Sequence, residues 1–108
     1  MFLGALLSLT LLAGCPRHEN IATLNNRSGY FMGKEVAVTG TVVSSIGLLG
    51  EGAFEVDDGT GRIWCISNGH GVPSKGSRVG VAGRYTAGLS FGGRSFASAI
   101  QLTHRPHY

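Results

Sequence analysis

The 108-residue sequence contains little of what most catalytic and metal sites are made from. It has two cysteines, one tryptophan and six acidic residues. Two cysteines are too few for the disulfide framework of a small secreted scaffold. The histidines are not spaced with one another, with cysteine or with acidic residues as zinc ligands are. We therefore expect no enzyme activity, no cofactor and no metal site; the histidines concerned are His18, His70, His104 and His107.

The sequence also lacks a long apolar run. Its apolar stretch, Phe2 to Ala13, has 12 residues, whereas a helix that spans a bilayer needs about 20. All charged residues lie after Gly14. The alternative to an export signal is a buried apolar helix, but Gly4, Gly14 and Pro16 suit a processing site better than a helix interior. The stretch therefore indicates an export signal rather than a membrane span.

The residues Leu12-Ala13-Gly14-Cys15 end this stretch and resemble a bacterial lipobox. The resemblance implies that signal peptidase cuts before Cys15, which then carries lipid, palmitate among its acyl chains. It divides the chain into a signal peptide (1–14), a lipidated tether (15–20) and a folded domain (21–108). Pro16, rather than Asp, follows the cysteine, which in that family favours the periplasmic side of the outer membrane in a cell with two membranes. The sequence departs from the usual signal peptide in one respect, because no Lys or Arg precedes Phe2. A wrongly assigned start codon would explain this departure.

Positive charge is in modest excess. Nine basic residues stand against six acidic ones, which gives a net charge of +3, and seven of the nine are arginine. Near a membrane, such an excess favours anionic partners such as lipid headgroups, acidic glycans or nucleic acid. It does not select among them.

From Lys34 onward, apolar residues alternate with a period of two, which is typical of strands with one buried face. Glycine, 18 of 108 residues, is well above its usual share of roughly 7%, as in a small, strongly coiled barrel. Asp58-Gly59 is a hairpin turn signal. Upstream, Asn20 predicts the N-cap of a short helix with Ile21 and Leu24 on one face. The expected strands are 34–46 with a bend or bulge at Gly40, 53–57, 62–67, 78–86 and 94–103, with glycine-rich loops at 47–52 and 87–93.

Three stretches of the chain resemble the OB-fold. Gly33 to Val42 resembles its first strand, Phe54 to Ile63 its hairpin between strands two and three, and Val72 to Gly83 the entry into strand four. The pattern is similar to the OB-folds of anticodon-binding and helicase-associated domains, and to small bacterial OB-fold lipoproteins. It implies an all-β, five-stranded antiparallel Greek-key barrel. Many OB-folds have a helix between strands three and four; here a short glycine-rich loop stands there, so the turn at Ile21–Leu24 would close one barrel end instead.

OB-folds bind ligands on the exposed face of strands two and three and on the adjacent loops. Alternation places Ile63 and Cys65 inside the barrel, where a lone cysteine is more often a small buried hydrophobe than a reactive thiol. An outward Trp64 beside Arg62 would stack a base, a sugar or an acyl edge; alternatively, Trp64 covers a barrel end or packs under a loop. The expected ligand-binding residues are Arg62, Trp64, Ile66, Arg84, Phe91 and Arg94.

The chain ends in His104 and Tyr108, spaced His-x-x-x-Tyr. This ending resembles that of the membrane-anchored OB-fold haem chaperone of cytochrome c maturation, and the resemblance implies haem held by His104. The acidic residues that follow the histidine in that family are missing here, and a lipid replaces the helical anchor. A chance occurrence of His104 and Tyr108 is the alternative to this haem or metal role.

The sequence thus predicts an exported lipoprotein of the cell envelope, anchored in the membrane by lipid. Its OB-fold is expected to be a non-catalytic binding module for an anionic polymer, an oligosaccharide or nucleic acid. The alternative is an envelope scaffold that binds a protein partner through the same face or through an open strand edge. Fold alone does not decide between them.

Overall fold

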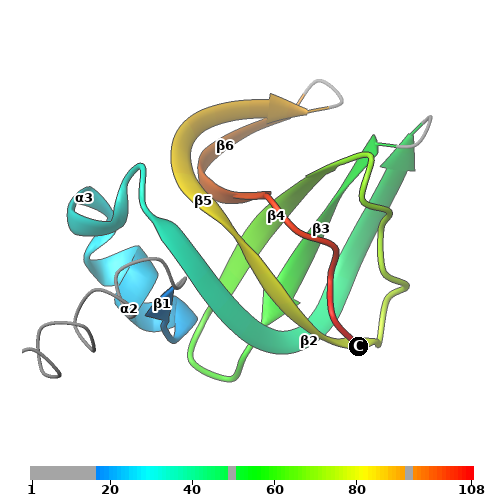
Figure 1. Ribbon diagram of the computed structural model, residues 1–108, viewed down its shortest axis with the longest axis horizontal. Helices are drawn as coiled ribbons and strands as arrows, with labels where there is room; N and C mark the ends of the chain where they lie inside the picture. Colours follow the sequence, from blue (N-terminus) through cyan, green and yellow to red (C-terminus); the bar gives the residue numbers. More distant parts are fainter. Residues whose placement is uncertain (1–16, 49–50, 92–93) are drawn as a thin grey trace, which may run out of the picture.

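The computed structural model describes residues 17–48, 51–91 and 94–108. Its elements are β1 (Arg17–His18), α2 (Ile21–Asn26), α3 (Ser28–Phe31), β2 (Glu35–Leu48), β3 (Glu51–Asp57), β4 (Arg62–Asn68), β5 (Arg78–Phe91) and β6 (Arg94–Leu102). The strands lie in one sheet in the order β1-β2-β3-β4-β6-β5, and β5 pairs back onto β2. Strands β2 to β6 thereby close into a five-stranded barrel, as the sequence predicts (Figure 1). No described helix is long and apolar enough to cross a membrane.

Strand β2 bends because it serves two partners. Its first half pairs with β5 and its second half with β3, and the partner changes at Thr41. A Cβ on Gly40 would lie 2.5 Å from the Asp57 carbonyl oxygen, so only glycine allows the strands to approach this closely. The register then shifts between Val42 and Ser44. The bend predicted at Gly40 is confirmed, and the bulge that sharpens it lies just beyond.

The predicted loops at 47–52 and 87–93 are wrong over most of their length. Strand β2 continues to Leu48 and β3 starts at Glu51; β5 continues to Phe91 and β6 starts at Arg94. The hydrogen bonds between paired strands are formed by backbone N–H and C=O groups, which glycine also has. The glycine-rich segments can therefore pair, and they lengthen both hairpins. Gly52 also has a packing reason, because a Cβ there would overlap the side chain of Val72.

The core follows the predicted alternation. Phe54, Val56, Ile63 and Cys65 are all at most 3% exposed. Burial raises the pKa of the Cys65 thiol, so this cysteine is an uncharged packing residue, as expected. The main cluster comprises Ile21, Leu24, Phe31, Val36, Val38, Val42, Phe54, Val56, Ile63, Cys65, Val79, Val81, Tyr85, Ile100 and Leu102.

Helix α2 closes one end of the barrel, as predicted. The Asn20 side chain accepts a hydrogen bond from the Thr23 N–H at 2.8 Å and caps the helix. Ile21 and Leu24 are fully buried, and each stabilises the fold by about 1.5–3 kcal/mol through burial. The Tyr85 hydroxyl donates to the Leu24 carbonyl at 3.3 Å. A second short helix, α3, follows α2, and the sequence does not predict it.

Two residues of the segment 15–20, for which the sequence predicts a tether, pair with the edge of strand β2. Arg17 and His18 form β1, which pairs in parallel with Val36 and Ala37 of β2. The Glu19 N–H extends this pairing by donating to the Ala37 carbonyl at 3.0 Å. The pattern of a two-residue strand is too short to be read from sequence.

Asp58 joins the β3–β4 turn to helix α2. Its Oδ2 accepts the Ile21 N–H at 2.9 Å, and its Oδ1 accepts the N–H of Thr60 at 2.9 Å and of Gly61 at 3.2 Å. Burial alone would raise the pKa of Asp58, but hydrogen bonds from Thr60, Ile21 and Gly61 outweigh it and hold the pKa below its usual 3.8. The stabilisation is therefore present above the unfolded-state pKa and is lost as pH falls through the lower folded-state pKa.

We expect Asp58→Asn to lower the free energy of unfolding by about 1–2 kcal/mol at pH 7, the loss of a partly exposed charged acceptor. The variant should also lose less stability than wild type when urea unfolding is repeated at pH 3. Asp57→Asn is the control, because the half-buried Asp57 side chain bonds only Gly59 and Arg62 and does not reach α2. Equal losses in both variants would contradict the role given to Asp58.

Candidate functional site

The structure places the three central residues of the predicted binding face on the outer side of β4, but it does not leave that face open. Arg62 is exposed and forms an ion pair with Asp57, Nε to Oδ2 3.0 Å. Trp64 is half-buried, and its ring packs against Phe96 with centroids 5.3 Å apart. Ile66 is 6% exposed. A ligand on this face therefore meets side chains that are already in contact with one another.

A second apolar cluster explains this covering. Ala53, Ile66, Phe96 and Ala99 form it, with Trp64 packed against them. The β5–β6 hairpin curls beyond the barrel (Figure 1), and Phe96 of β6 packs in this cluster. Ile66 is thus buried in this cluster rather than exposed: alternation predicts its direction, but it does not predict the packing with Phe96 of the neighbouring strand β6. Trp64 packs against Phe96, which belongs to strand β6 rather than to a loop.

Of the remaining predicted residues, the structure describes the side chain of Arg84 alone, and it lies elsewhere. Arg84 Nη1 donates to the Gly33 carbonyl at 2.9 Å, so its charge lies at the loop after α3. Phe91 and Arg94 face each other in the β5–β6 ladder, and their side chains lie outside the described part of the structure. Cys15 also lies outside the described residues.

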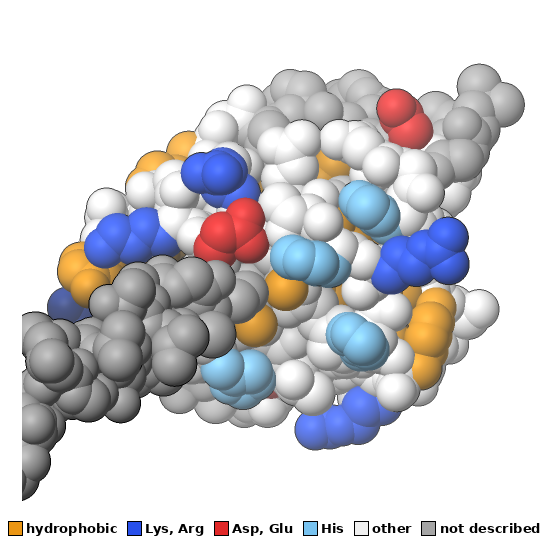
Figure 2. Space-filling model, viewed as in Figure 1, with side chains coloured by type: hydrophobic (Ala, Val, Ile, Leu, Met, Phe, Trp, Pro, Cys, Tyr) orange, Lys and Arg blue, Asp and Glu red, His pale blue; other side chains and the backbone are white. Residues whose placement is uncertain are grey.

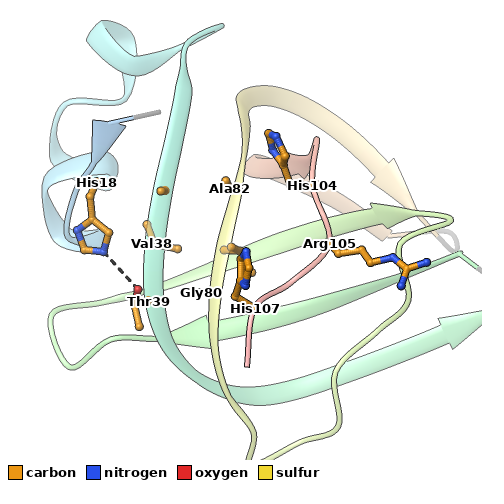
Figure 3. Close-up of a pocket in the computed structure, with 10 residues that line it drawn as sticks. His18, Val38, Thr39, Gly80, Ala82, His104, Arg105 and His107 are labelled. Atoms are coloured by element: carbon orange, nitrogen blue, oxygen red, sulfur yellow. Dashed lines mark hydrogen bonds between the residues drawn. The ribbon is translucent and has the colours of Figure 1, made fainter. Parts of the chain in front are cut away.

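A cavity of about 290 Å³ lies elsewhere, on the outer face of β2 and β5. Its floor is flat because the outward residues there are small: Ala37 on β2, and Gly80 and Ala82 on β5. Thr39 continues the floor on β2. Figure 3 shows His18 on one side of these two strands and the C-terminal segment on the other. We call this site the histidine groove; its lining residues are His18, Ala37, Val38, Thr39, Gly80, Val81, Ala82, His104, Arg105 and His107.

Backbone pairing fixes both walls of the groove. On one side, β1 sets His18 opposite Ala37. On the other, the C-terminal segment runs along β5: the N–H of His107 donates to the Gly80 carbonyl at 2.8 Å, and the Gly80 N–H donates back at 2.7 Å. The walls thus come from the two ends of the described chain.

Hydrogen bonds orient two of the imidazole rings. His18 Nε2 lies 3.3 Å from Thr39 Oγ1. Thr103 Oγ1 donates to Glu35 Oε2 at 3.1 Å, and the same oxygen lies 3.0 Å from His104 Nδ1. Because the hydroxyl proton is committed to Glu35, His104 Nδ1 is the donor to Thr103. The Nε2 of His104 is then the nitrogen left to meet a ligand.

The lining has cationic and aromatic chemistry and no carboxylate. Three imidazoles and the Arg105 guanidinium surround an apolar floor, and none of the lining residues is acidic. Figure 2 shows histidine side chains gathered on this face. Among the described residues, no group of three or more His, Cys, Asp or Glu is arranged to hold a metal ion. Tyr108 does not line the groove and is 83% exposed, so the groove unites His104 with His18 and His107 rather than with Tyr108.

Sequence reasoning missed His18, Arg105 and His107. The available signal was a pair of short basic and histidine-containing segments, Arg17-His18 near the start and His104-Arg105-Pro106-His107 at the end. Nothing in the sequence shows that these two segments flank the same pair of strands, because both are held by isolated backbone pairs.

No family model matches the sequence, and no curated protein matches it. The fold is similar to a solved structure described as an aspartyl-tRNA synthetase from Leishmania major Friedlin, with a TM-score of 0.60 and 16% sequence identity. The similarity covers 87% of this chain and 21% of that one, so this chain spans about a fifth of that protein's length. At this identity the similarity concerns the fold. Together with the closed barrel, it confirms the OB-fold predicted from the sequence.

Proposed function

We propose that this OB-fold is a non-catalytic binding module that holds an anionic polymer, single-stranded nucleic acid in the first place, in the histidine groove. The observation that carries the proposal is the lining itself: three imidazoles and one guanidinium around a flat apolar floor, without a carboxylate. Guanidinium groups pair with phosphate, and imidazole rings stack on unpaired bases. A flat floor of Ala37, Gly80 and Ala82 leaves room for a base or sugar ring.

A non-catalytic role agrees with how the reactive groups are used. The Cys65 thiol is buried within the core. The carboxylates of Asp57 and Asp58 are engaged in the β3–β4 turn.

We place the module in the cell envelope, held at the membrane by lipid on Cys15. The support for this location is the sequence Leu12-Ala13-Gly14-Cys15 after an apolar stretch. In that location, a nucleic-acid binder would serve DNA capture or uptake rather than a housekeeping role.

The test measures the affinity of the full chain carrying Cys15→Ser for a fluorescent oligothymidylate of about twelve nucleotides, a typical site size for one OB-fold. Arg105→Gln should weaken binding roughly five- to tenfold. It should also reduce the slope of log affinity against log salt by about 0.7 for a lost phosphate contact. His18→Gln, on the opposite wall, should weaken binding as well, because it removes an imidazole ring that can stack on an unpaired base.

The matched control is Arg62→Gln, which removes the same charge from the β4 face. Its affinity should stay within about twofold of wild type, since most exposed charges contribute little individually. Loss of binding in Arg62→Gln, with wild-type affinity in Arg105→Gln, would move the site to the β4 face. No binding of oligothymidylate by wild type would overturn the ligand class.

A further inference from the structure

We infer that a second surface, built around helix α3, docks the domain onto anionic lipid headgroups. This surface, the α3 patch, consists of Arg27, Tyr30, Met32, Lys34 and Arg84. The α3 patch is independent of the histidine groove. It is also distinct from the proposed lipid anchor, although both would contact the membrane.

The α3 patch exposes large apolar side chains beside cations. Tyr30 is 46% exposed and Met32 is 37% exposed. Lys34 Nζ lies 3.5 Å from the centre of the Tyr30 ring, and the Arg27 guanidinium carbon lies 5.0 Å from it. At the end of the molecule that carries α3, Figure 2 shows hydrophobic side chains bordered by Lys and Arg. Such a mixture suits a membrane interface, where an aromatic ring sits at headgroup level and cations meet phosphate.

Charge in the α3 patch is of one sign. Residues 20–34 contain Arg27 and Lys34 and no acidic residue. Arg84 adds a third exposed cation, held by its hydrogen bond to the Gly33 carbonyl. Acidic residues border this range on both sides, Glu19 and Glu35; Glu35 lies opposite Arg84 in the β2–β5 ladder and accepts a hydrogen bond from Thr103. The patch is therefore complementary to an anionic surface.

The position of the α3 patch along the chain identifies a membrane as its partner. The first described residue, Arg17, pairs with Val36, two residues after Lys34. The chain thus enters the barrel beside the patch, and the residues before it include the apolar stretch Phe2 to Ala13 and Cys15. A membrane reached by that segment lies within a few residues of Arg17, and Lys34 of the patch lies two residues before Val36, the ladder partner of Arg17.

The test compares binding of the full chain carrying Cys15→Ser to phosphatidylcholine vesicles with and without phosphatidylglycerol. The apolar stretch can insert into both kinds of vesicle, so the measured quantity is the ratio of the two affinities. In Arg27→Gln/Lys34→Gln this ratio should fall roughly 25-fold, at about fivefold for each basic residue near an anionic surface. Thermal unfolding should remain close to wild type, because both side chains are exposed.

The matched control is Lys75→Gln/Arg78→Gln, which removes two exposed cations at the start of β5, at the other end of the β2–β5 ladder from Arg84. Its ratio should change by less than about threefold, because the effect of a charge falls off within a Debye length. Equal losses in the two double variants would show attraction by net charge alone and overturn the patch, as would no loss in either. Oligothymidylate affinity, measured on the same proteins, should be unchanged in Arg27→Gln/Lys34→Gln, so failure of the groove and failure of the patch are separate results.

Discussion

Gly83→Ala is expected to destabilise the protein by about 3 kcal/mol or more, a large share of the 5–15 kcal/mol typical of a domain. Gly83 lies where β5 leaves β2 and joins β6, opposite Val36 on one side and Leu102 on the other. A Cβ there would collide with the Gln101 carbonyl oxygen, and would lie 2.8 Å from its carbon and 2.9 Å from Ile100 Cγ2. Because the obstacle is backbone, the barrel itself must shift.

The measurement is thermal unfolding, in which the melting temperature should fall by roughly 12 °C or more, at about 4 °C per kcal/mol. Gly80→Ala is the matched control, three residues away on the same strand. Its added Cβ would find Thr39 Oγ1 at 3.7 Å and His107 Cβ at 3.8 Å, which is ordinary contact. That variant should melt within a few degrees of wild type, since Gly to Ala at a compatible site is neutral or slightly stabilising. Similar melting temperatures for the two variants would contradict the β5–β6 register.

Cys15→Ser is expected to abolish stable membrane attachment in the cell. Two or more acyl chains give durable anchoring, whereas none leaves only weak surface contacts. Intact mass should show added lipid on the wild-type protein and none on the variant, and fractionation should move the variant from the membrane to the soluble fraction. The Arg27→Gln/Lys34→Gln protein is the control, because it keeps Cys15 and should keep the lipid. If wild type is itself soluble and unmodified, Phe2 to Ala13 is not an export signal, and the OB-fold would act on nucleic acid inside the cell.

Much of the barrel could be predicted because its physical causes are local. Alternation of apolar residues marks the inward faces, so Phe54 and Cys65 lie where the sequence places them. The Asn20 cap and the Asp58-Gly59 turn act within a few residues, and both are confirmed. What local pattern misses is where a strand stops: β5 runs on through 87–91 because pairing with β6 continues over residues whose side chains suggest a loop.

The functional site was harder to predict, because it depends on which segments meet. Strand parity gives Trp64 and Ile66 their direction, but the cluster with Phe96 that covers them depends on how far the β5–β6 hairpin curls. The groove depends on β1 and on the Gly80–His107 bridge. These two pairings bring residue 18 and residues 104–107 into the same site. Such long-range pairs leave no periodic signal in one sequence.

The most direct test of the groove is backbone amide mapping by NMR. The ¹⁵N-labelled full chain carrying Cys15→Ser would be titrated with oligothymidylate at low salt. We predict that the shifts concentrate at β1, at Ala37–Thr39 and Gly80–Ala82 on the floor, and at the C-terminal segment from His104 to His107. The chemical shifts of the Trp64 indole N–H and of the β4 amides should not change. Shifts centred on Trp64 and Arg62, with an unchanged C-terminal segment, would contradict the account and return the binding site to the β4 face.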